Sequence, residues 1–488
     1  MLMSFSSYKK YFFAGLIFLF SFFCFTSSMR PFNTTDSYPN NLVALSWLFN
    51  SRLDLTYLYE ELKLRGIENI AVVNNQGVVY PKTPIILGIL NIPGFSFLNK
   101  IYGVSNLSSF EMVFSDYSQY AGKYLASFYC AASAAFLFLI ALNIFNQYYS
   151  SLVATGTYVF ATNVFNTASQ ANWQHGISLF FITLMILLIL KNNKKLWSFL
   201  LVGVIFQLLI QIRISNIFYL PFVMLALFGT LNPFKYNQKK IAFFMIGLLI
   251  IFLPIFLLNN LLKIPYGYQD ALYLGIKKIS LFKAIGAIFS ILFSLNVGLF
   301  TFSPVLLLGL LSIKKILQKG KKNQAMILLK YSLPTLLIFI LFCGIWPYWT
   351  GGTSLGARML TETVPIWCLL VGLLMYLSKK HIYKILFIFL FIASFLINIL
   401  TTFMIDGWWF DLYTKQTIES QFTDAWYDKP SLFEYLLKTR IIYFADFKKD
   451  GNLITSTLWM KRPTFKDKRI VDVYQKKSII LDVSNAKR

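Results

Sequence analysis

Apolar runs long enough to cross a bilayer as helices recur along most of the chain, and they limit what it can fold into. The hydrocarbon core of a bilayer requires about 20 consecutive apolar residues in a helix. The composition agrees, because 57% of the residues are hydrophobic and only 13% are charged. A soluble globular protein carries roughly a quarter charged residues. The sequence therefore predicts an all-α polytopic membrane protein and argues against a cytosolic enzyme.

The formal net charge of +25 comes largely from lysines in short clusters between the apolar runs and in the C-terminal segment. Such clusters are typical of cytoplasmic loops, which fix helix orientation and contact anionic lipid headgroups. No nucleic-acid recognition motif accompanies them, so we expect membrane lipids as partners and no nucleic acid. Four cysteines, at positions 24, 130, 343 and 368, lie in or beside apolar runs. Without metal-ligand spacing, they predict neither a disulfide framework nor a zinc site.

Eleven membrane helices are expected. The first lies within residues 1–28, after a basic start and without a convincing signal-peptide cleavage pattern. The other ten form a bundle over residues 121–404. Their expected ranges are 121–145, 150–168, 175–190, 196–212, 216–231, 241–260, 284–312, 326–345, 359–378 and 382–404.

Lysine-rich loops set the expected orientation of these helices. The loops concerned are 191–195, 235–240, 314–322 and 379–384, whereas the loop near 146–149 has no basic residue. Basic loops stay on the cytoplasmic side, so the N-terminus is expected inside and the C-terminus outside. This arrangement places an outer catalytic loop with interfacial helices at 29–120 and an outer tail at 405–488. Pro84, Pro93 and Gly94 interrupt the apolar stretch 83–98, so we expect it at the interface rather than across the membrane.

The first candidate for chemistry is Asp36, which follows the first helix in the sequence Asn-Thr-Thr-Asp-Ser-Tyr-Pro-Asn-Asn. Partial desolvation at the membrane interface can raise the pKa of such an acid and make it a usable base. The alternative is a helix N-cap, because Asp is favoured there and an apolar stretch follows at 42–49. The residue types alone leave both interpretations open.

Three further polar segments interrupt the apolar pattern. Tyr80 and Lys82 lie in a Tyr-Pro-Lys-Thr-Pro segment, where Lys82 either offers a cation at headgroup level or snorkels beside a turn. Trp173 and His175 lie at the start of a helix on the outer side of the membrane. They form either a platform for a sugar or an aromatic belt residue with a polar cap. Arg213, between two apolar runs, either snorkels or binds a phosphate in a bidentate way.

The most informative motif covers residues 346–362. Its candidate residues are Trp346, Trp349, Gly351, Gly352, Arg358 and Glu362. The tryptophans offer stacking faces, and the paired glycines let the backbone approach a ligand and cradle an anion. Arg358 and Glu362 are four residues apart at a helix start, so they share a face, and the alternative to a ligand role is that they pair with each other.

Two weaker patterns remain. Gly298 and Pro304 fall inside one apolar run and predict a broken helix whose break faces protein or a cavity. The tail segment 424–430 combines acids, aromatics and a proline. No Walker motif, dinucleotide fingerprint, zincin motif or nucleophile elbow occurs in the sequence, which argues against a nucleotide-driven pump or a serine hydrolase.

Taken in order, these motifs resemble those of the GT-C superfamily of integral-membrane glycosyltransferases. The relatives concerned are uncharacterised bacterial proteins similar to the dolichyl-phosphate-mannose–protein mannosyltransferase group. The run Trp-Thr-Gly-Gly-Thr-Ser-Leu-Gly-Ala-Arg at 349–358 matches their Trp-x-Gly-Gly-x-Ser-x-Gly-x-Arg in full and is the most specific piece. The other matching pieces are Asp36, Tyr80-Pro81, Trp173-x-His175, Gly298 with Ser303-Pro304, and Trp426-x-x-x-Pro430.

The resemblance implies an inverting transferase that moves a sugar from a polyprenyl-phosphate donor to an acceptor hydroxyl. The reaction would take place on the outer face of the bacterial inner (plasma) membrane, towards the periplasm or exterior. An outer-loop carboxylate deprotonates the acceptor in such enzymes, and this role falls on Asp36. A second early acid is matched only loosely by Glu111 or Asp116, so no cofactor or metal is expected, although a divalent metal is left open.

A cation must hold the donor phosphate at headgroup level, and the candidates are Arg358, Arg213 and Lys82. The remaining residues are assigned to substrate binding: Tyr80, Trp173, His175, Trp346, Trp349, Gly351, Gly352 and Glu362. If the assignment is correct, Asp36 and the 351–358 loop meet at one cavity at the outer interface of the folded protein.

Two alternatives belong to other classes. A lipid-linked glycan polymerase or ligase usually has its large outer loop late in the chain, whereas here the largest outer loop comes first. A lipid-linked glycan flippase or transporter should carry ionisable residues in the middle of the membrane, and the predicted helices hold few. Neither the sugar nor the acceptor can be read from the sequence.

Overall fold

The computed structural model of the protein describes residues 5–28, 36–64, 66–114, 116–192, 195–228, 238–262, 281–319, 324–346, 349–351, 356–378, 380–404, 443–447 and 453–457. Gly352, the motif at 424–430 and most of the predicted tail 405–488 lie outside the described residues.

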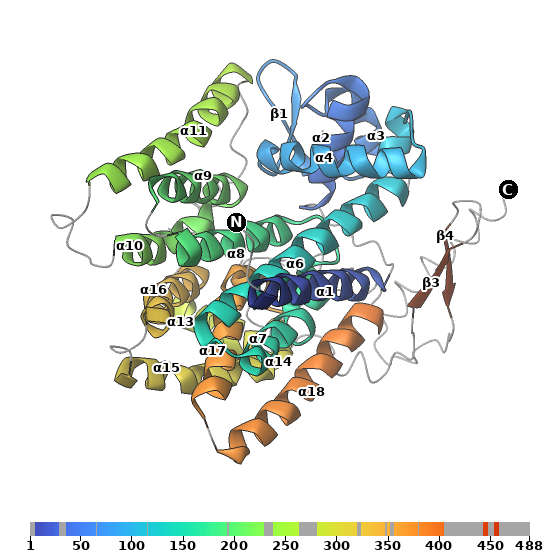
Figure 1. Ribbon diagram of the computed structural model, residues 1–488. Helices are drawn as coiled ribbons and strands as arrows, with labels where there is room; N and C mark the ends of the chain where they lie inside the picture. The colour runs from blue at the N-terminus through green and yellow to red at the C-terminus, as the bar shows by residue number, and fades with distance from the viewer. Residues whose placement is uncertain are drawn as a thin grey trace.

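The described secondary structure is helical apart from two short hairpins (Figure 1). The longest helices are α1 (Phe5–Thr26), α6 (Asp116–Phe145), α8 (Gln174–Asn192), α11 (Gln238–Leu262), α16 (Gln324–Ile345) and α18 (His381–Met404). Shorter helices lie between them: α7 (Tyr148–Phe160), α9 (Leu196–Ile212), α10 (Leu220–Phe228), α13 (Leu281–Phe293), α14 (Leu299–Phe302), α15 (Leu307–Lys319) and α17 (Val364–Leu377).

Among the described residues, eight helical segments are long and apolar enough to cross a membrane. They are Tyr8–Thr26, Ile85–Tyr102, Tyr117–Phe145, Gln174–Lys191, Gln238–Leu261, Ile327–Ile345, Arg358–Leu377 and His381–Phe403. Shorter apolar helices in the same part of the chain are Leu196–Ile212, Ile214–Leu227 and Leu281–Phe293. The predicted class, an all-α polytopic membrane protein, is confirmed. The count of eleven spans stays a prediction.

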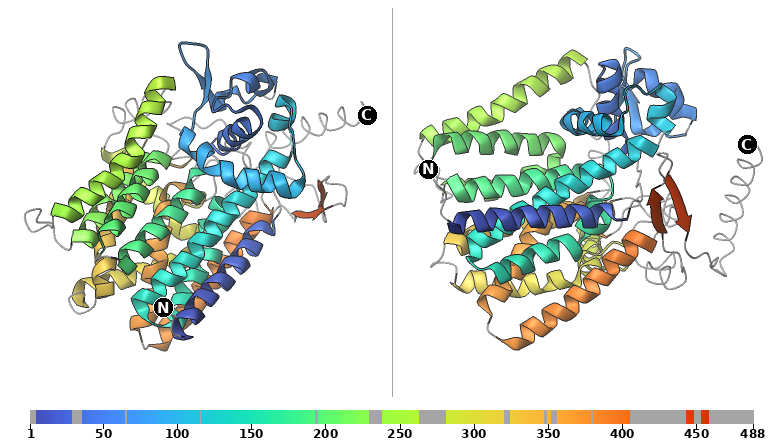
Figure 2. Two further views of the ribbon diagram at one scale, coloured as in Figure 1. Left: turned by 45° about the horizontal axis from the view of Figure 1, so that its top comes forward. Right: turned by 45° about the vertical axis from the view of Figure 1, so that its right-hand side comes forward.

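Aromatic contacts show that the lysine-bearing helix ends lie together. Near the start of α1, the ring of Phe13 packs on Tyr148 of α7, and Phe145 stacks on Tyr376 near the end of α17. Lysine–aromatic pairs connect further ends, namely Lys191 with Tyr11, Lys240 with Phe199 and Lys315 with Tyr383. The predicted lysine-rich loops therefore adjoin helix ends that gather around the start of α1, on the left of the second view in Figure 2.

The opposite end of the bundle carries a small unit built from residues 36–114 (Figure 2). It contains α2 (Tyr38–Asn50), α3 (Tyr59–Leu64), α4 (Ile85–Tyr102), α5 (Ser109–Phe114) and the antiparallel hairpin of β1 (Ala71–Val73) and β2 (Val79–Pro81). Leu42, Leu45 and Leu58 are fully buried in its apolar core, which is distinct from that of the long helices. A second hairpin pairs β3 (Tyr443–Phe447) with β4 (Leu453–Thr457).

The stretch predicted as interrupted by prolines is instead the continuous helix α4. Pro84 is its N-cap, a position that requires no helical N–H from proline, and Pro93 lies inside the helix. Gly94 allows close packing rather than a break, because a Cβ there would overlap the side chain of Leu125 on α6. The effect of these residues depends on the neighbouring helix, which local sequence does not reveal.

The predicted break near Gly298 and Pro304 is confirmed, and the expected run 284–312 is divided into α13, α14 and α15. Side chains of α18 satisfy backbone groups freed by the break. Asn398 Nδ2 donates to the Phe302 carbonyl oxygen at 2.9 Å, and Ser394 Oγ accepts from the Val305 N–H at 3.0 Å. The break thus faces protein, as irregular backbone at membrane depth must.

Two other expected helices change helix type along their length. The run 150–168 becomes α7, which ends at Phe160, followed by a π-helix at Val164–Ala168. The helix expected at 359–378 begins as a 3-10 helix, Arg358–Thr363, before α17 continues it. Hydrophobic periodicity locates these segments but does not distinguish the helix type within them.

Candidate functional site

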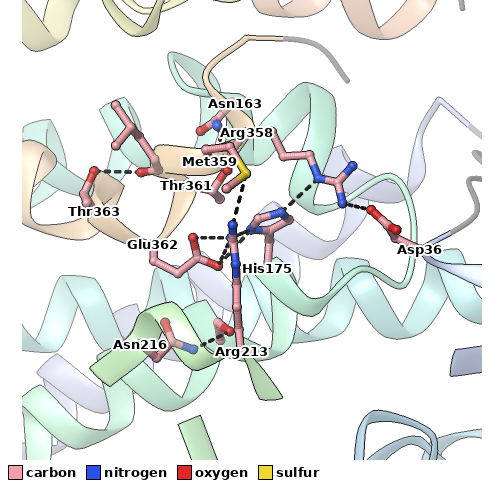
Figure 3. Close-up of polar contacts among 12 residues, drawn as sticks. Asp36, Asn163, His175, Arg213, Asn216, Arg358, Met359, Thr361, Glu362 and Thr363 are labelled. Atoms are coloured by element: carbon pink, nitrogen blue, oxygen red, sulfur yellow. Dashed lines mark hydrogen bonds and ion pairs between the residues drawn. The ribbon is translucent and has the colours of Figure 1, made fainter. Parts of the chain in front are cut away.

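Arg358 lies at the centre of a polar cluster at the end of the bundle that carries the small unit (Figure 3). Its Nη2 binds the carboxylate of Asp36, which is separated from α2 by the N-cap residue Ser37. Its Nε donates to His175 Nε2 at 3.0 Å, and Nη1 donates to the Gly351 carbonyl oxygen at 3.3 Å. The guanidinium also lies over the Trp173 ring, 4.7 Å from the centroid. These contacts fix the orientation of the guanidinium.

His175 connects this arginine to a second ion pair. Because Nε2 accepts the hydrogen bond from Arg358, the imidazole proton lies on Nδ1. Nδ1 then donates to Glu362 Oε1 at 2.8 Å, and Arg213 Nη1 lies 2.9 Å from the same nitrogen. The contacts therefore assign His175 as the neutral Nδ1–H tautomer.

Glu362 is completely buried and is neutralised by Arg213. Arg213 Nη1 lies 2.9 Å from each Glu362 carboxylate oxygen, and Nη2 donates to the Met359 sulfur at 3.2 Å. Tyr219 adds a 2.7 Å hydrogen bond to the Glu362 carbonyl oxygen. A buried carboxylate requires such pairing, because an isolated buried charge is strongly unfavourable.

Amide side chains hold the Asp36 segment against the helix start at His175. Asn40 Nδ2 donates to the carbonyl oxygens of Asp36 at 3.1 Å and Asn172 at 2.8 Å, and Asn40 Oδ1 accepts from Thr83 at 2.8 Å. Asn172 Nδ2 in turn donates to Asn41 Oδ1 at 2.8 Å. These bonds bring three distant parts of the sequence together around the ion pair.

The Arg358 segment is supported from the bundle side. Asn163 Nδ2, just before the π-helix, donates to the Ala357 carbonyl oxygen at 3.2 Å and to Thr361 Oγ1 at 2.8 Å. Thr361 Oγ1 also donates to the Arg358 carbonyl oxygen at 2.7 Å. Arg358 is therefore anchored through its backbone as well as its side chain.

The predicted meeting of Asp36 with the Arg358 segment is confirmed by their ion pair. A cavity over the pair stays a prediction. The N-cap interpretation of Asp36 is wrong, because Ser37 precedes the first residue of α2 and the Asp36 side chain turns to Arg358. The alternative pairing of Arg358 with Glu362 is also wrong. In a 3-10 helix, residues four apart point about 120° apart rather than the roughly 40° of an α-helix.

The expected rise in the pKa of Asp36 is also wrong. Burial does raise it, but the charge and hydrogen bond of Arg358 outweigh burial and hold the pKa of Asp36 below its ordinary value. Asp36 is therefore an ion-paired carboxylate in this structure. A base at this position needs the pair to open.

The other predicted residues differ in how deeply they are buried. Trp173 is 1% exposed and its ring carries the Arg358 guanidinium, so that face is not open to a sugar. Tyr80 is buried on β2, and Lys82 is exposed just after it. Trp349 is buried, whereas Trp346 packs on Phe342 with a ring separation of 5.4 Å. Substrate contacts of these residues stay predictions.

Sequence reasoning assigned no role to Asn40, Asn41, Asn163 and Tyr219. Asn40 and Asn41 stand in the motif around Asp36, and their partner Asn172 lies beside Trp173. Their nearness to predicted site residues could therefore have indicated that they belong to the site. Asn163 and Tyr219 lie within or beside predicted apolar helices, and nothing local indicates their partners. Among the described residues, no group of three His, Cys, Asp or Glu side chains could hold a metal ion.

Comparisons with protein-family models and with curated proteins found no match to this chain.

Proposed function

We propose that the protein is a membrane glycosyltransferase that moves a sugar from a polyprenyl-phosphate donor to an acceptor hydroxyl. The observation that carries the proposal is the contact between the Asp36 carboxylate and the Arg358 guanidinium. Side-chain exposures of 31% for Asp36 and 13% for Arg358 leave both within reach of a ligand. Together they offer the two groups that this transfer needs, a proton acceptor and a phosphate binder.

In the proposed reaction, the acceptor oxygen attacks the anomeric carbon from the side opposite the phosphate. The new carbon–oxygen bond forms while the bond from the anomeric carbon to the phosphate oxygen breaks, which inverts the configuration. Asp36 takes the acceptor proton, and polyprenyl phosphate leaves with the bonding electrons. Because the leaving phosphate is already ionised, Arg358 can stabilise it without a general acid.

Arg358 suits the phosphate role because its planar fork is already oriented by His175 and Trp173. Arg213 and Glu362 bind each other through both carboxylate oxygens. We therefore assign these two residues to positioning His175, in place of the phosphate and substrate contacts expected from the sequence. Lys82, which is exposed close to the Asn40–Thr83 contact, remains a second candidate cation.

We infer that the lysine-bearing end faces the cytoplasm and that the cluster faces the outside of a bacterial plasma membrane. Retention of basic residues on the cytoplasmic side supports this orientation. With α4 at the interface and the broken segment 284–312 counted as one span, eleven spans give an inside N-terminus and an outside C-terminus. The small unit and Asp36 then lie where a lipid-linked donor presents its headgroup.

The test is sugar transfer by the purified full chain in detergent from a panel of radiolabelled polyprenyl-phosphate sugars. We expect labelled product and free polyprenyl phosphate from at least one donor, and loss of both in Asp36→Asn. Asp54→Asn is the matched control, since the Asp54 carboxylate accepts from the Thr56 N–H at 3.0 Å within the small unit, outside the cluster.

Three outcomes would contradict the proposal. Transfer from none of the donors removes the enzymatic role. Movement of a lipid-linked glycan between the leaflets of proteoliposomes that contain the purified chain, without release of sugar, would favour the flippase. Chain extension of a polymeric donor would identify the polymerase or ligase instead.

A further inference from the structure

The partners of Arg358 differ in how firmly they are held. His175 and Trp173 are 2% and 1% exposed, and they contact the guanidinium at Nε and at its face. His175 is fixed in turn by Glu362, which Arg213 holds through both carboxylate oxygens. The position of the guanidinium therefore does not depend on Asp36.

Asp36 is the exposed partner in this arrangement. Its side chain is 31% exposed, and it approaches Nη2 from the side of the guanidinium away from His175 (Figure 3). A carboxylate oxygen and a phosphate oxygen accept equally well from a guanidinium N–H, and a phosphate can bring a second negative charge. Asp36 thus occupies the place that an incoming phosphate would take.

We propose that Asp36 and a lipid-borne phosphate exchange at Arg358, so that arrival of the phosphate releases the Asp36 carboxylate. The identity of the ligand rests on the proposed function, whereas the exchange rests on the contacts of Arg358. His175 and Trp173 keep the guanidinium in place during the exchange. The base then becomes free only when the donor is bound, which imposes an order in which donor binding precedes deprotonation of the acceptor.

The electrostatics of Asp36 agree with this order. Burial raises its pKa, but the Arg358 charge holds the pKa below the ordinary value while the two are paired. A phosphate that neutralises Arg358 removes the largest of the influences that lower this pKa. The released carboxylate then binds a proton more readily and is a better general base.

The exchange makes a prediction of unusual sign, because removing the catalytic carboxylate should strengthen binding of the donor phosphate. The measurement is the Kd of the full chain in detergent for polyprenyl phosphate without a sugar. Asp36→Asn and Asp36→Ala should each bind about 3- to 30-fold more tightly than the wild type, since no charge-assisted hydrogen bond must be broken. Asp54→Asn should not change the Kd, and Arg358→Ala should bind more weakly.

A second arm with phosphatidylglycerol identifies the source of the phosphate. If the Asp36 variants bind only polyprenyl phosphate more tightly, Asp36 exchanges with the phosphate of the donor carrier. If they bind phosphatidylglycerol more tightly by the same factor, Asp36 exchanges with lipid headgroup phosphates in general. Unchanged or weaker binding by both Asp36 variants in both arms would overturn the proposal.

The binding experiment tests the exchange, and the sugar-transfer experiment tests the transferase, so either proposal can fail without the other. Tighter binding by the Asp36 variants, in a protein that transfers no sugar, would retain the exchange and refute the transferase. Sugar transfer by the wild type, with no gain in binding by the variants, would retain the transferase and refute the exchange.

Discussion

His175 joins Arg358 to Glu362 through one neutral ring, accepting at Nε2 and donating at Nδ1. The ring is buried between two arginines, so its hydrogen bonds cannot be replaced by bulk water. An unsatisfied buried polar group costs about 1–3 kcal/mol, and more when it is charged. The stability of the cluster should therefore depend on the ring nitrogens and not only on the ring's volume.

His175→Phe tests this dependence, because it keeps a ring of similar size and removes both nitrogens. We expect the free energy of unfolding to fall by about 1–3 kcal/mol and the Kd for polyprenyl phosphate to rise. The protein has one other histidine, His381, which is exposed at the start of α18 and provides the matched control His381→Phe. Equal thermal unfolding of the two variants in detergent would show that the nitrogens of His175 carry no such role.

The lowered pKa of Asp36 predicts how its ion pair responds to pH. Burial raises the pKa of Asp36, but the positive charge and hydrogen bond of Arg358 lower it further than burial raises it. The pKa in the folded protein therefore lies below the unfolded value of about 3.9. The stabilisation is thus fully present above about pH 5 and is lost as the pH falls through the folded pKa. The difference in Tm between wild type and Asp36→Asn should stay constant from pH 8 to 5 and shrink below pH 4. A difference that already shrinks between pH 7 and 5 would mean that the pKa is raised.

At the level of elements, α9 and α11 meet through two glycines. A Cβ on Gly203 would overlap the Phe244 carbonyl oxygen, and a Cβ on Gly247 would overlap that of Leu200. Close backbone approach of this kind is how membrane helices gain packing where lipid is as apolar as their own side chains. These two glycines therefore determine how tightly α11 attaches to the bundle.

Gly203→Ala and Gly247→Ala should each destabilise the protein by about 1–3 kcal/mol, because backbone cannot move aside as a side chain can. Gly156→Ala on α7 is the control, since a Cβ there meets no atom within 4 Å. We expect Gly156→Ala to be neutral or to stabilise by up to about 1 kcal/mol. Thermal unfolding of the three variants in detergent gives the comparison, and equal effects would refute the close contact.

The existence of most helices could be predicted because each apolar run must satisfy its backbone hydrogen bonds internally. Helix type could not be predicted, and helix continuity was predicted correctly at Gly298 and Pro304 but not in α4. The 3-10 geometry of Arg358–Thr363 turns Glu362 away from Arg358 and towards Arg213. Pro93 stays inside α4, where the sequence indicated an interruption. Both outcomes depend on neighbouring elements rather than on the residues themselves.

Across the whole molecule, the two ends of the bundle carry different kinds of charged side chain. Lysine–aromatic contacts mark the end where α1 begins, and paired arginines and carboxylates mark the other. Asp36 and Arg358 are 322 positions apart, and their meeting could be predicted only from complementary chemistry at a shared end. The sequence did not predict the pairing of Arg213 with Glu362 or the amide contacts of Asn40, because no spacing in the sequence relates these residues to their partners.

This division predicts the orientation of the chain. Lys82 and Lys191 are both exposed, one beside the cluster and the other at the opposite end. In a background without native cysteines, Lys82→Cys should react with an impermeant thiol reagent from outside the cell. Lys191→Cys should react only after the membrane is opened. Reaction of both from the same side would contradict the orientation.

The central claim is that Asp36 and Arg358 act on one substrate in different roles, and donor-dependent sugar transfer by variants of the full chain tests it most directly. Asp36→Asn should lower kcat by about 10²- to 10⁴-fold without raising the KM for the donor. Arg358→Ala should raise that KM, and Arg358→Lys should recover only part of the loss, because a point charge replaces a planar fork. Full turnover by Asp36→Asn would contradict the account and leave Glu111 and Asp116 as the remaining candidates for the base.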